Sequence, residues 1–258
     1  MPRSRAAAAA VALVALVSVL AACNVVGTKA AVVVKKPVIY LAVGASETIG
    51  TGADIPEDQA WPRVFFRDDA RLPKGSTYVN VGVSGSTVAD ALTKQAPEVA
   101  RVKPDLVTVW LNVNDLLHLV PTLTYEAELK DLVHQLRRGG LAKVLVANTP
   151  DLSHLPVVTA CLSLVPTPGR DCPVPNIFRG PPLLGMVNSA VADYNAAIAR
   201  VVAAEGAVLV DLNAAILARR ADGTEPTLVS SDGFHPSTAG HAAVAAEFAK
   251  ALVAAGGP

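Results

Sequence analysis

Residues 38–50 read VIYLAVGASETIG. Residues 38–43 form a continuous apolar run, typical of a strand buried on both faces, and the run leads directly into a turn that begins at Gly44. A glycine-led turn at the carboxyl end of such a strand usually faces a ligand. Two hypotheses follow. The turn either cradles the phosphates of a nucleotide or presents Ser46 as a nucleophile.

The rest of the chain alternates between short apolar runs and segments of helical periodicity. We predict strands at residues 38–43, 77–81, 106–111, 143–147 and 207–211. We predict helices at residues 61–72, 87–102, 125–138, 186–205 and 238–254. This alternation is typical of a three-layer α/β/α fold, in which helices cover both faces of a parallel sheet of about five strands. The site is then expected at the carboxyl ends of the strands.

The first residues have the pattern of an export signal. Arg3 and Arg5 precede the apolar stretch 6–22, and the sequence LAAC that ends this region resembles the lipobox of bacterial lipoproteins. We therefore expect a signal peptide at 1–22, lipidation at Cys23, a tether over 23–36 and a single folded domain over 37–258. The protein would be exported and lipid-anchored on the extracytoplasmic side of the cell membrane. An ordinary signal peptide or a retained transmembrane anchor are the alternatives.

Composition excludes some partners and cofactors. The 258-residue chain has a formal net charge of zero, so nothing in its charge favours nucleic-acid binding. No His/Cys cluster has the spacing of a zinc site, and we expect no metal and no cofactor. In an exported protein the two remaining cysteines, Cys161 and Cys172, predict a disulfide. They lie in a proline-rich insertion at 150–185, which is either a lid over the site or a surface decoration.

The nucleotide hypothesis fails on three requirements. The turn resembles that of short-chain dehydrogenases, but Thr48 stands where their middle glycine allows the backbone to approach a pyrophosphate. No tyrosine is followed four residues later by lysine, which is the catalytic pair of those enzymes. The second strand ends near Asn80 and Gly82, without the acidic residue that would bind a ribose.

The nucleophile hypothesis is supported by a resemblance to the SGNH, or GDSL, hydrolases, which covers residues 38–255. The four blocks of that family align, in family order, with residues 44–46, 80–87, 112–115 and 232–236. Ala45 replaces the family's Asp in the first block, and Asn112 replaces its Gly in the third. The resemblance implies a flavodoxin-like fold and a serine esterase. Asn112 would place a side chain near the substrate.

The resemblance also implies the roles of the site residues. Ser46 is the expected nucleophile, and the oxyanion hole would combine the main-chain N–H groups of Ser46 and Gly85 with the Asn114 amide. Asp-x-x-His occurs three times, as Asp131/His134, Asp151/His154 and Asp232/His235. Because the third has the family's flanking Gly and Pro, we predict His235 as the general base and Asp232 as its orienting carboxylate. His154 is the reserve base or a substrate contact.

The predicted function is therefore that of a serine esterase of the cell envelope. It would hydrolyse small acyl esters through an acyl-enzyme, and we expect a monomer. Two alternatives stay open. A cell-surface binding lipoprotein could retain this fold without catalysis, since Ala45 and Asn112 depart from the family pattern. An acyltransferase could use the same acyl-enzyme.

Overall fold

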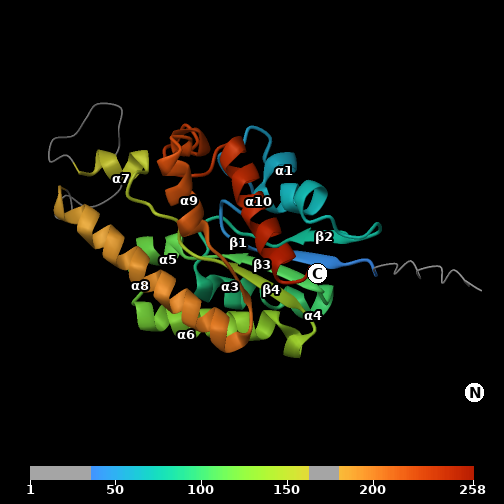
Figure 1. Ribbon diagram of the computed structural model, residues 1–258. Coiled ribbons are helices and arrows are strands. Elements are labelled where there is room, and N and C mark those ends of the chain that lie inside the picture. The colour runs from blue at the N-terminus through green and yellow to red at the C-terminus, as the bar shows by residue number, and fades with distance from the viewer. Residues whose placement is uncertain (1–35, 163–179) are drawn as a thin grey trace, which may run out of the picture. The chain divides into compact units, whose positions relative to one another are not determined.

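The computed structural model describes residues 36–162 and 180–258 (Figure 1). Its five strands form one parallel sheet in the order β2-β1-β3-β4-β5. The strands are β1 (Ile39–Gly44), β2 (Thr77–Asn80), β3 (Leu106–Trp110), β4 (Lys143–Ala147) and β5 (Val208–Val210). The predicted fold class, a three-layer α/β/α arrangement of the flavodoxin-like type with about five parallel strands, is confirmed.

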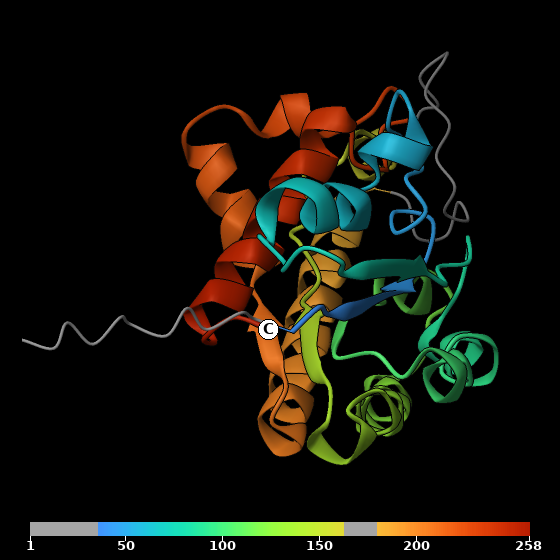
Figure 2. The same cartoon turned by 90° about the vertical axis from the view of Figure 1, so that its right-hand side faces the viewer.

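Two apolar clusters hold the helices against opposite faces of the sheet. One face packs α3 (Val88–Lys94), α6 (Thr122–Leu136) and α8 (Pro182–Glu205) against alternate residues of the central strands, such as Leu41, Val107 and Val144. The other face packs α2 (Trp61–Val64) and α10 (Thr238–Ala254) against the intervening residues. Figure 2 shows the red α10 on one side of the strands and the yellow-green α6 on the other.

An aromatic contact joins α2 to α10. The rings of Trp61 and Phe248 are stacked with centroids 4.2 Å apart, and both side chains are fully buried. Stacking of this kind adds about 0.5–1.5 kcal/mol to the free energy of burial. Next to it, the main-chain N–H of Trp61 donates to Nδ1 of His241 on α10. These contacts hold the start of α10, and with it the loop that precedes α10, close to the segment that follows β1.

The remaining elements are short helices. They are α1 (Pro56–Gln59), η1 (Phe65–Asp69), α4 (Glu98–Val102), α5 (Val113–Leu117), η2 (Arg138–Gly140), α7 (Pro156–Ala160), α9 (Leu212–Ala221) and η4 (Glu225–Leu228). Within the ranges that the structure describes, no helix combines the length and apolarity needed to cross a bilayer.

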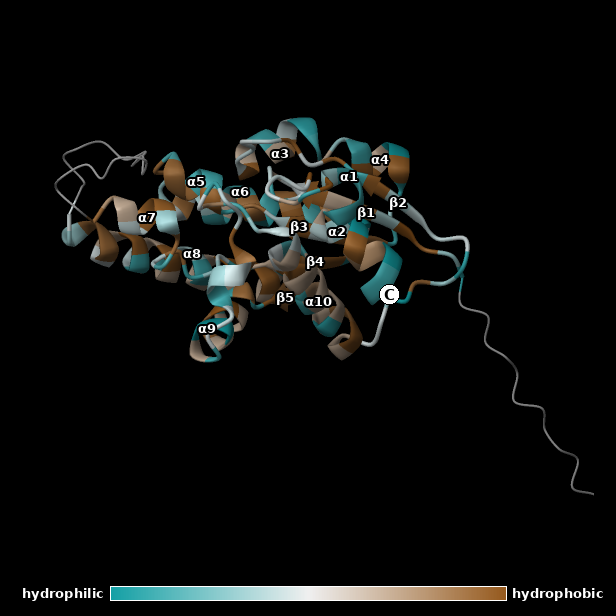
Figure 3. Cartoon of the chain, turned by 90° about the horizontal axis from the view of Figure 1, so that it is seen from above, coloured by the Kyte–Doolittle hydropathy of each residue, from teal (hydrophilic) through white to brown (hydrophobic). Residues whose placement is uncertain are grey.

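Several predicted boundaries are wrong for identifiable reasons. The helix predicted over 87–102 is two helices, α3 and α4, because Pro97 between them has no N–H to donate to the preceding turn. The helix predicted to start at residue 186 begins four residues earlier, at Pro182, since proline is favoured in a first turn. Helix α9 was not predicted, although Asp211 caps it by accepting a hydrogen bond from the Ala214 N–H. In Figure 3, α9 shows both polar and apolar segments.

Candidate active site

Ser46 lies in a tight turn directly after β1. The main-chain N–H of Thr48 donates to the Ala45 carbonyl at 3.1 Å, and the N–H of Thr51 donates to the Ser46 carbonyl at 3.0 Å. Ser46 is 7% exposed. Ala45, where the resemblance has an aspartate, is 1% exposed and packs into the apolar cluster beside α3 and α6. The turn therefore forms through main-chain bonds, without a carboxylate at that position.

Asp232, His235 and Ser46 form one hydrogen-bonded series. The Nε2 atom of His235 lies 3.0 Å from Oγ of Ser46, and its Nδ1 lies 2.7 Å from Oδ2 of Asp232. A carboxylate only accepts hydrogen bonds, so it favours the tautomer with the proton on Nδ1 and the Nε2 lone pair toward Ser46. The structure thus brings together the three residues predicted as catalytic, in the geometry that a serine nucleophile and its base require.

The Asp232 carboxylate is held in its ionised form. Burial by itself raises the pKa of this carboxyl group. Hydrogen bonds from the Ser230 hydroxyl, from His235 and from two main-chain N–H groups outweigh that effect and lower the pKa to about 2. Each of these donors stabilises the charged form of the carboxylate. Asp232 is therefore negative throughout the neutral pH range and can stabilise an imidazolium on His235.

The other two Asp-x-x-His pairs do not form such a series. His154 Nδ1 lies 3.3 Å from the Glu225 carboxylate, while Asp151 accepts from Ser153 and Arg220. His134 is exposed on α6 and pairs with Glu205 at 3.1 Å. The three Asp-x-x-His pairs thus have three different sets of partners, and of their three histidines only His235 contacts Ser46.

The loop that carries His235 is fixed on both sides. The main-chain N–H of Ser230 donates to the His235 carbonyl at 2.9 Å, and Ser237 caps α10 by accepting from the Gly240 N–H. On the opposite side, Gly52 packs directly against the loop. It has φ +95°, and a Cβ added there would overlap the Pro236 carbonyl and lie 2.9 Å from the His235 Cβ. A glycine is therefore needed where the nucleophile segment meets the histidine loop.

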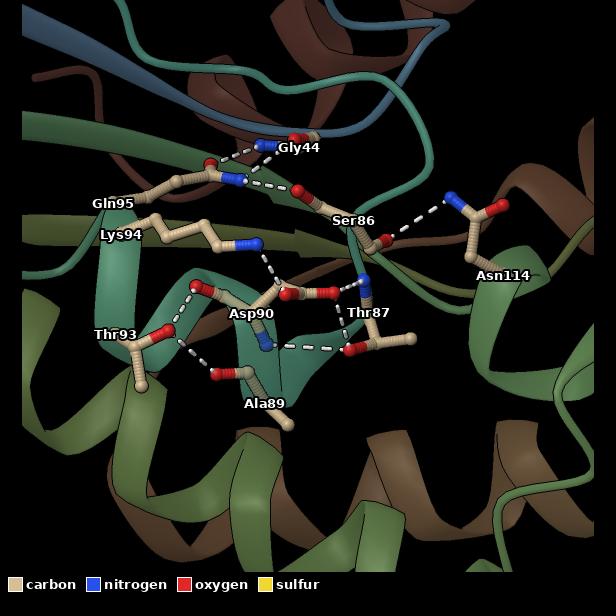
Figure 4. A network of polar contacts seen from close by, with 9 residues as sticks. All are labelled: Gly44, Ser86, Thr87, Ala89, Asp90, Thr93, Lys94, Gln95 and Asn114. Atoms are coloured by element: carbon tan, nitrogen blue, oxygen red, sulfur yellow. Dashed lines mark hydrogen bonds and ion pairs between the residues drawn. The ribbon is translucent and has the colours of Figure 1, made fainter.

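The second predicted block, residues 80–87, lies beside the end of β1. The N–H of Val83 donates to the Gly44 carbonyl at 3.1 Å, and Asn114 Nδ2 on α5 donates to the Ser86 carbonyl at 3.0 Å (Figure 4). Gly85 has φ +77°, and a Cβ there would meet no atom within 4 Å. Glycine is thus favoured here by the left-handed backbone and not by crowding from neighbouring protein atoms.

Gln95, the residue at the C-terminal cap of α3, was not singled out by the sequence and holds these segments together. Its side-chain carbonyl accepts from the Gly44 N–H, and its amide donates to the Gly44 carbonyl, both at 3.0 Å, and to Ser86 Oγ at 3.2 Å (Figure 4). Gln95 is fully buried. A glutamine at the end of a helix has no local signature for its contact with Gly44, because the two residues lie 51 positions apart in the sequence.

Asn112 lies in the segment after β3. It is 1% exposed, and its amide donates to the Ala147 carbonyl at the end of β4 at 3.4 Å. It is not among the residues that line the cavity described below. The side chain links the segment after β3 to the end of β4, and its predicted contact with substrate stays a prediction. The neighbouring Asp115 caps α3 by accepting from the Val88 N–H at 3.1 Å.

A cavity of about 540 Å³ opens beside His235. Its walls come from the end of β3, the segment after β4, helices α9 and α10, and η4. Most of them are apolar, and they include Trp110, Leu155, Ile216, Leu228 and Phe234. The part of the 150–185 insertion that the structure describes borders this cavity through residues that include His154, and its role as a lid stays a prediction. Glu47, directly after Ser46, also lines it.

Some predictions concern residues whose structure is not described. Cys23 and Cys172 lie outside the described residues, as do the signal peptide and most of the tether. Cys161 is 1% exposed, and its disulfide with Cys172 stays a prediction. Among the described residues, no group of three or more His, Cys, Asp or Glu side chains is arranged to hold a metal ion.

Comparisons with known proteins give this geometry a context. The sequence model of the GDSL-like Lipase/Acylhydrolase family matches residues 42–243. A search of curated proteins found no match. The crystal structure of TesA is 23% identical with a TM-score of 0.58, covering 83% of this chain and 97% of that one. A phospholipase A1 from Streptomyces albidoflavus NA297 is 18% identical with a TM-score of 0.57, covering 85% and 99%. The psychrotrophic esterase EstA from Pseudoalteromonas sp. is 15% identical with a TM-score of 0.58, covering 84% and 97%.

Proposed function

This chain belongs to the GDSL-like lipase/acylhydrolase family and is a serine hydrolase, and on that premise we propose that it hydrolyses carboxylic esters through an acyl-enzyme on Ser46. The observation that carries the proposal is the 3.0 Å contact between Ser46 Oγ and His235 Nε2, with Asp232 on the far side of the imidazole. An activated serine of this kind is suited to attack an ester carbonyl.

The proposed reaction proceeds in two halves. Ser46 Oγ attacks the ester carbonyl carbon while His235 Nε2 takes the hydroxyl proton, and the resulting imidazolium is stabilised by Asp232. When the tetrahedral intermediate collapses, His235 returns that proton to the leaving alcohol. Water then attacks the acyl-enzyme, with His235 again taking a proton, and the carboxylic acid departs as Ser46 Oγ is reprotonated.

The oxyanion of both tetrahedral intermediates needs donors on the opposite side of Ser46 from His235. We propose the main-chain N–H groups of Ser46 and Gly85 and the amide of Asn114 for this role. One amide hydrogen of Asn114 is used by the Ser86 carbonyl, which orients the group and leaves the second hydrogen for a ligand. Donors fixed in advance in this way stabilise developing charge without having to reorganise.

The cavity supports an apolar group on the substrate. Its walls are mainly aliphatic and aromatic, and its volume of about 540 Å³ lies within the range of pockets that enclose small organic ligands. The polar triad at one edge and the apolar walls behind it would suit an ester with a short or medium hydrocarbon chain. The sequence LAAC, which ends at Cys23 and resembles a lipobox, supports a location at the cell envelope, with the enzyme anchored by lipid on the extracytoplasmic side.

Labelling with a fluorophosphonate tests the activated serine without a choice of substrate. We expect a single adduct on the Ser46 peptide, none in Ser46→Ala, and loss of labelling in His235→Ala but not in His154→Ala. Ester hydrolysis with a panel of acyl chain lengths would follow. A folded wild type that takes no label would contradict the proposal and favour a protein that only binds.

The proposed anchor has its own experiment. We expect the protein to incorporate an alkyne-tagged fatty acid when expressed in bacteria and to sediment with membranes. Cys23→Ala should abolish both properties, while Cys161→Ala should still incorporate the label. A Cys23→Ala protein that kept the tag would contradict lipidation at this position.

A further inference from the structure

Glu47 is a buried carboxyl group next to the nucleophile. It directly follows Ser46, is 9% exposed and faces the cavity. Oγ of Ser46 lies 3.3 Å from its Oε2 atom. Glu47 takes part in none of the ion pairs formed by residues 36–162 and 180–258. A carboxyl group in such a place needs a physical reason, since burial without a cation is costly for a charge.

The Ser46 hydroxyl therefore has two partners that compete for one proton. His235 Nε2 lies 3.0 Å away and Glu47 Oε2 lies 3.3 Å away, but the hydroxyl can donate only once. An uncharged Glu47 has a proton of its own, so it can donate to Oγ and leave the serine proton to His235. An ionised Glu47 only accepts, so it draws the serine proton toward itself. Its negative charge also favours the imidazolium form of His235, which cannot act as a base.

The surroundings favour the uncharged form over a wider pH range than usual. Burial raises the pKa of Glu47, and the opposing effects of its own main-chain N–H, of His235 and of Ser46 offset this only in part. Other titratable or charged groups face the same cavity from the segment after β4, α9, η4, the histidine loop and α10. They are Asp151, His154, Arg219, Glu225, His235 and Glu247.

Most of those groups have partners of their own. Asp151 and Glu225 share Arg220, and His154 pairs with Glu225. Glu247 pairs with Lys250, and His235 pairs with Asp232. His235 is the group whose charge acts directly on Glu47.

We propose that Glu47 is a positioning residue for the nucleophile: its uncharged carboxyl group directs the Ser46 proton to His235, and its ionisation withdraws that proton and slows the enzyme. The inference rests on the proposed function, because it takes Ser46 as the nucleophile and His235 as the base. It assigns the residue after the nucleophile a role that depends on pH.

The test is the pH dependence of kcat/KM for hydrolysis of p-nitrophenyl butyrate by the full-length protein. In the wild type we expect kcat/KM to fall to a lower plateau over the pH range in which Glu47 ionises. Glu47→Gln has an amide donor at every pH, so it should lose this fall and run about three- to tenfold faster than the wild type at pH values above it.

A second variant separates the donor from the charge. Glu47→Leu removes both, so we expect no alkaline fall but a kcat about two- to twelvefold below that of Glu47→Gln, the effect of one neutral hydrogen bond. KM should change little. Glu57→Gln makes the same chemical change on the exposed helix α1, outside the site, and should match the wild type at every pH.

The outcomes distinguish this inference from the proposed function. A wild type that neither labels with fluorophosphonate at Ser46 nor hydrolyses esters overturns the proposed function. A wild type that does both, with no alkaline fall or with a profile identical to that of Glu47→Gln, overturns the role of Glu47 alone. A folded Glu47→Gln that labels poorly and loses most of its activity would mean that the ionised carboxylate is needed, which also overturns it. The wild-type profile decides the question by itself if Glu47→Leu does not fold.

Discussion

The side-chain amide of Gln95 pairs with both main-chain polar groups of Gly44, accepting from the N–H and donating to the carbonyl at 3.0 Å each. Gly44 is the last residue of β1 and stands two residues before Ser46. The contact reproduces, with one side chain, the pair of hydrogen bonds that a neighbouring strand would make. It therefore ends the strand and sets the position from which the nucleophile turn begins.

We expect Gln95→Leu to destabilise the fold and to reduce activity. The substitution leaves a buried N–H and a buried carbonyl without this partner, at a cost of about 2 kcal/mol in the free energy of unfolding. Urea denaturation measures this, with Gln135→Leu, an exposed glutamine on α6, as the control. Equal stability of the two variants would show that the Gly44 contact contributes nothing.

Asn114→Ala should reduce turnover without unfolding the protein. Removal of one oxyanion donor typically lowers kcat by about 10²–10³-fold, and KM should change little because the interaction strengthens in the transition state. Steady-state kinetics on a reactive ester provides the measurement, and Asn188→Ala on the exposed surface of α8 is the matched control. A wild-type kcat in a folded Asn114→Ala would exclude this amide from the mechanism.

Gly52→Ala should disturb the contact between the nucleophile segment and the histidine loop. A methyl group would overlap the Pro236 carbonyl, so His235 must move or the φ of residue 52 must change. We expect kcat to fall by at least about tenfold, because a small displacement of the base has a large effect on proton transfer. Gly256→Ala is the control, since Gly256 also has a positive φ of 84° but no atom within 4 Å of the added Cβ.

If Gly52→Ala and Gly256→Ala lose the same stability and neither loses activity, backbone strain at the positive φ would account for the whole effect of the Gly52→Ala substitution. The close approach to His235 would then have no part in catalysis.

The buried carboxyl group of Asp115 should make the free energy of unfolding depend on pH. Burial raises its pKa to about 6, and hydrogen bonds from the N–H of Val88 offset this in part. Between the ordinary pKa of an aspartate and about 6, the folded protein binds more protons at this site than the unfolded chain. The contribution of Asp115 is therefore fully present at low pH and is lost as the pH rises through about 6, by about 3 kcal/mol at most.

Asp115→Asn keeps the oxygen that accepts from Val88 but does not titrate. Its free energy of unfolding should be flatter than that of the wild type between pH 4 and 6. Urea denaturation at several pH values provides the comparison, and parallel curves for the two proteins would contradict the raised pKa.

Local patterns were sufficient for the strands and for the longer helices. The bounds predicted for β4 and α10 agree with the structure, because an apolar run flanked by polar residues and a capped amphipathic run are signals within one segment. Pro97 indicates a helix boundary, but the residues on both sides of it have helical periodicity, and we therefore predicted one continuous helix. Helix α9 is short, so its helical periodicity spans too few turns to stand out in the sequence. Its apolar residues Leu212, Ala215 and Ile216 face the cavity.

The sequence by itself determined the fold class, the position of Ser46 at a strand end and the ordered blocks around it, since these depend on residues close together in the chain. The flanking Gly and Pro favoured His235 among the three Asp-x-x-His pairs, but only the tertiary structure brought its ring to Ser46, because the two residues lie 189 positions apart and the spacing carries no information on what lies opposite. The contacts of Gln95 and Glu47 depend on the fold in the same way. A buried polar side chain is defined by the partners that packing brings to it, and those partners are not adjacent in sequence.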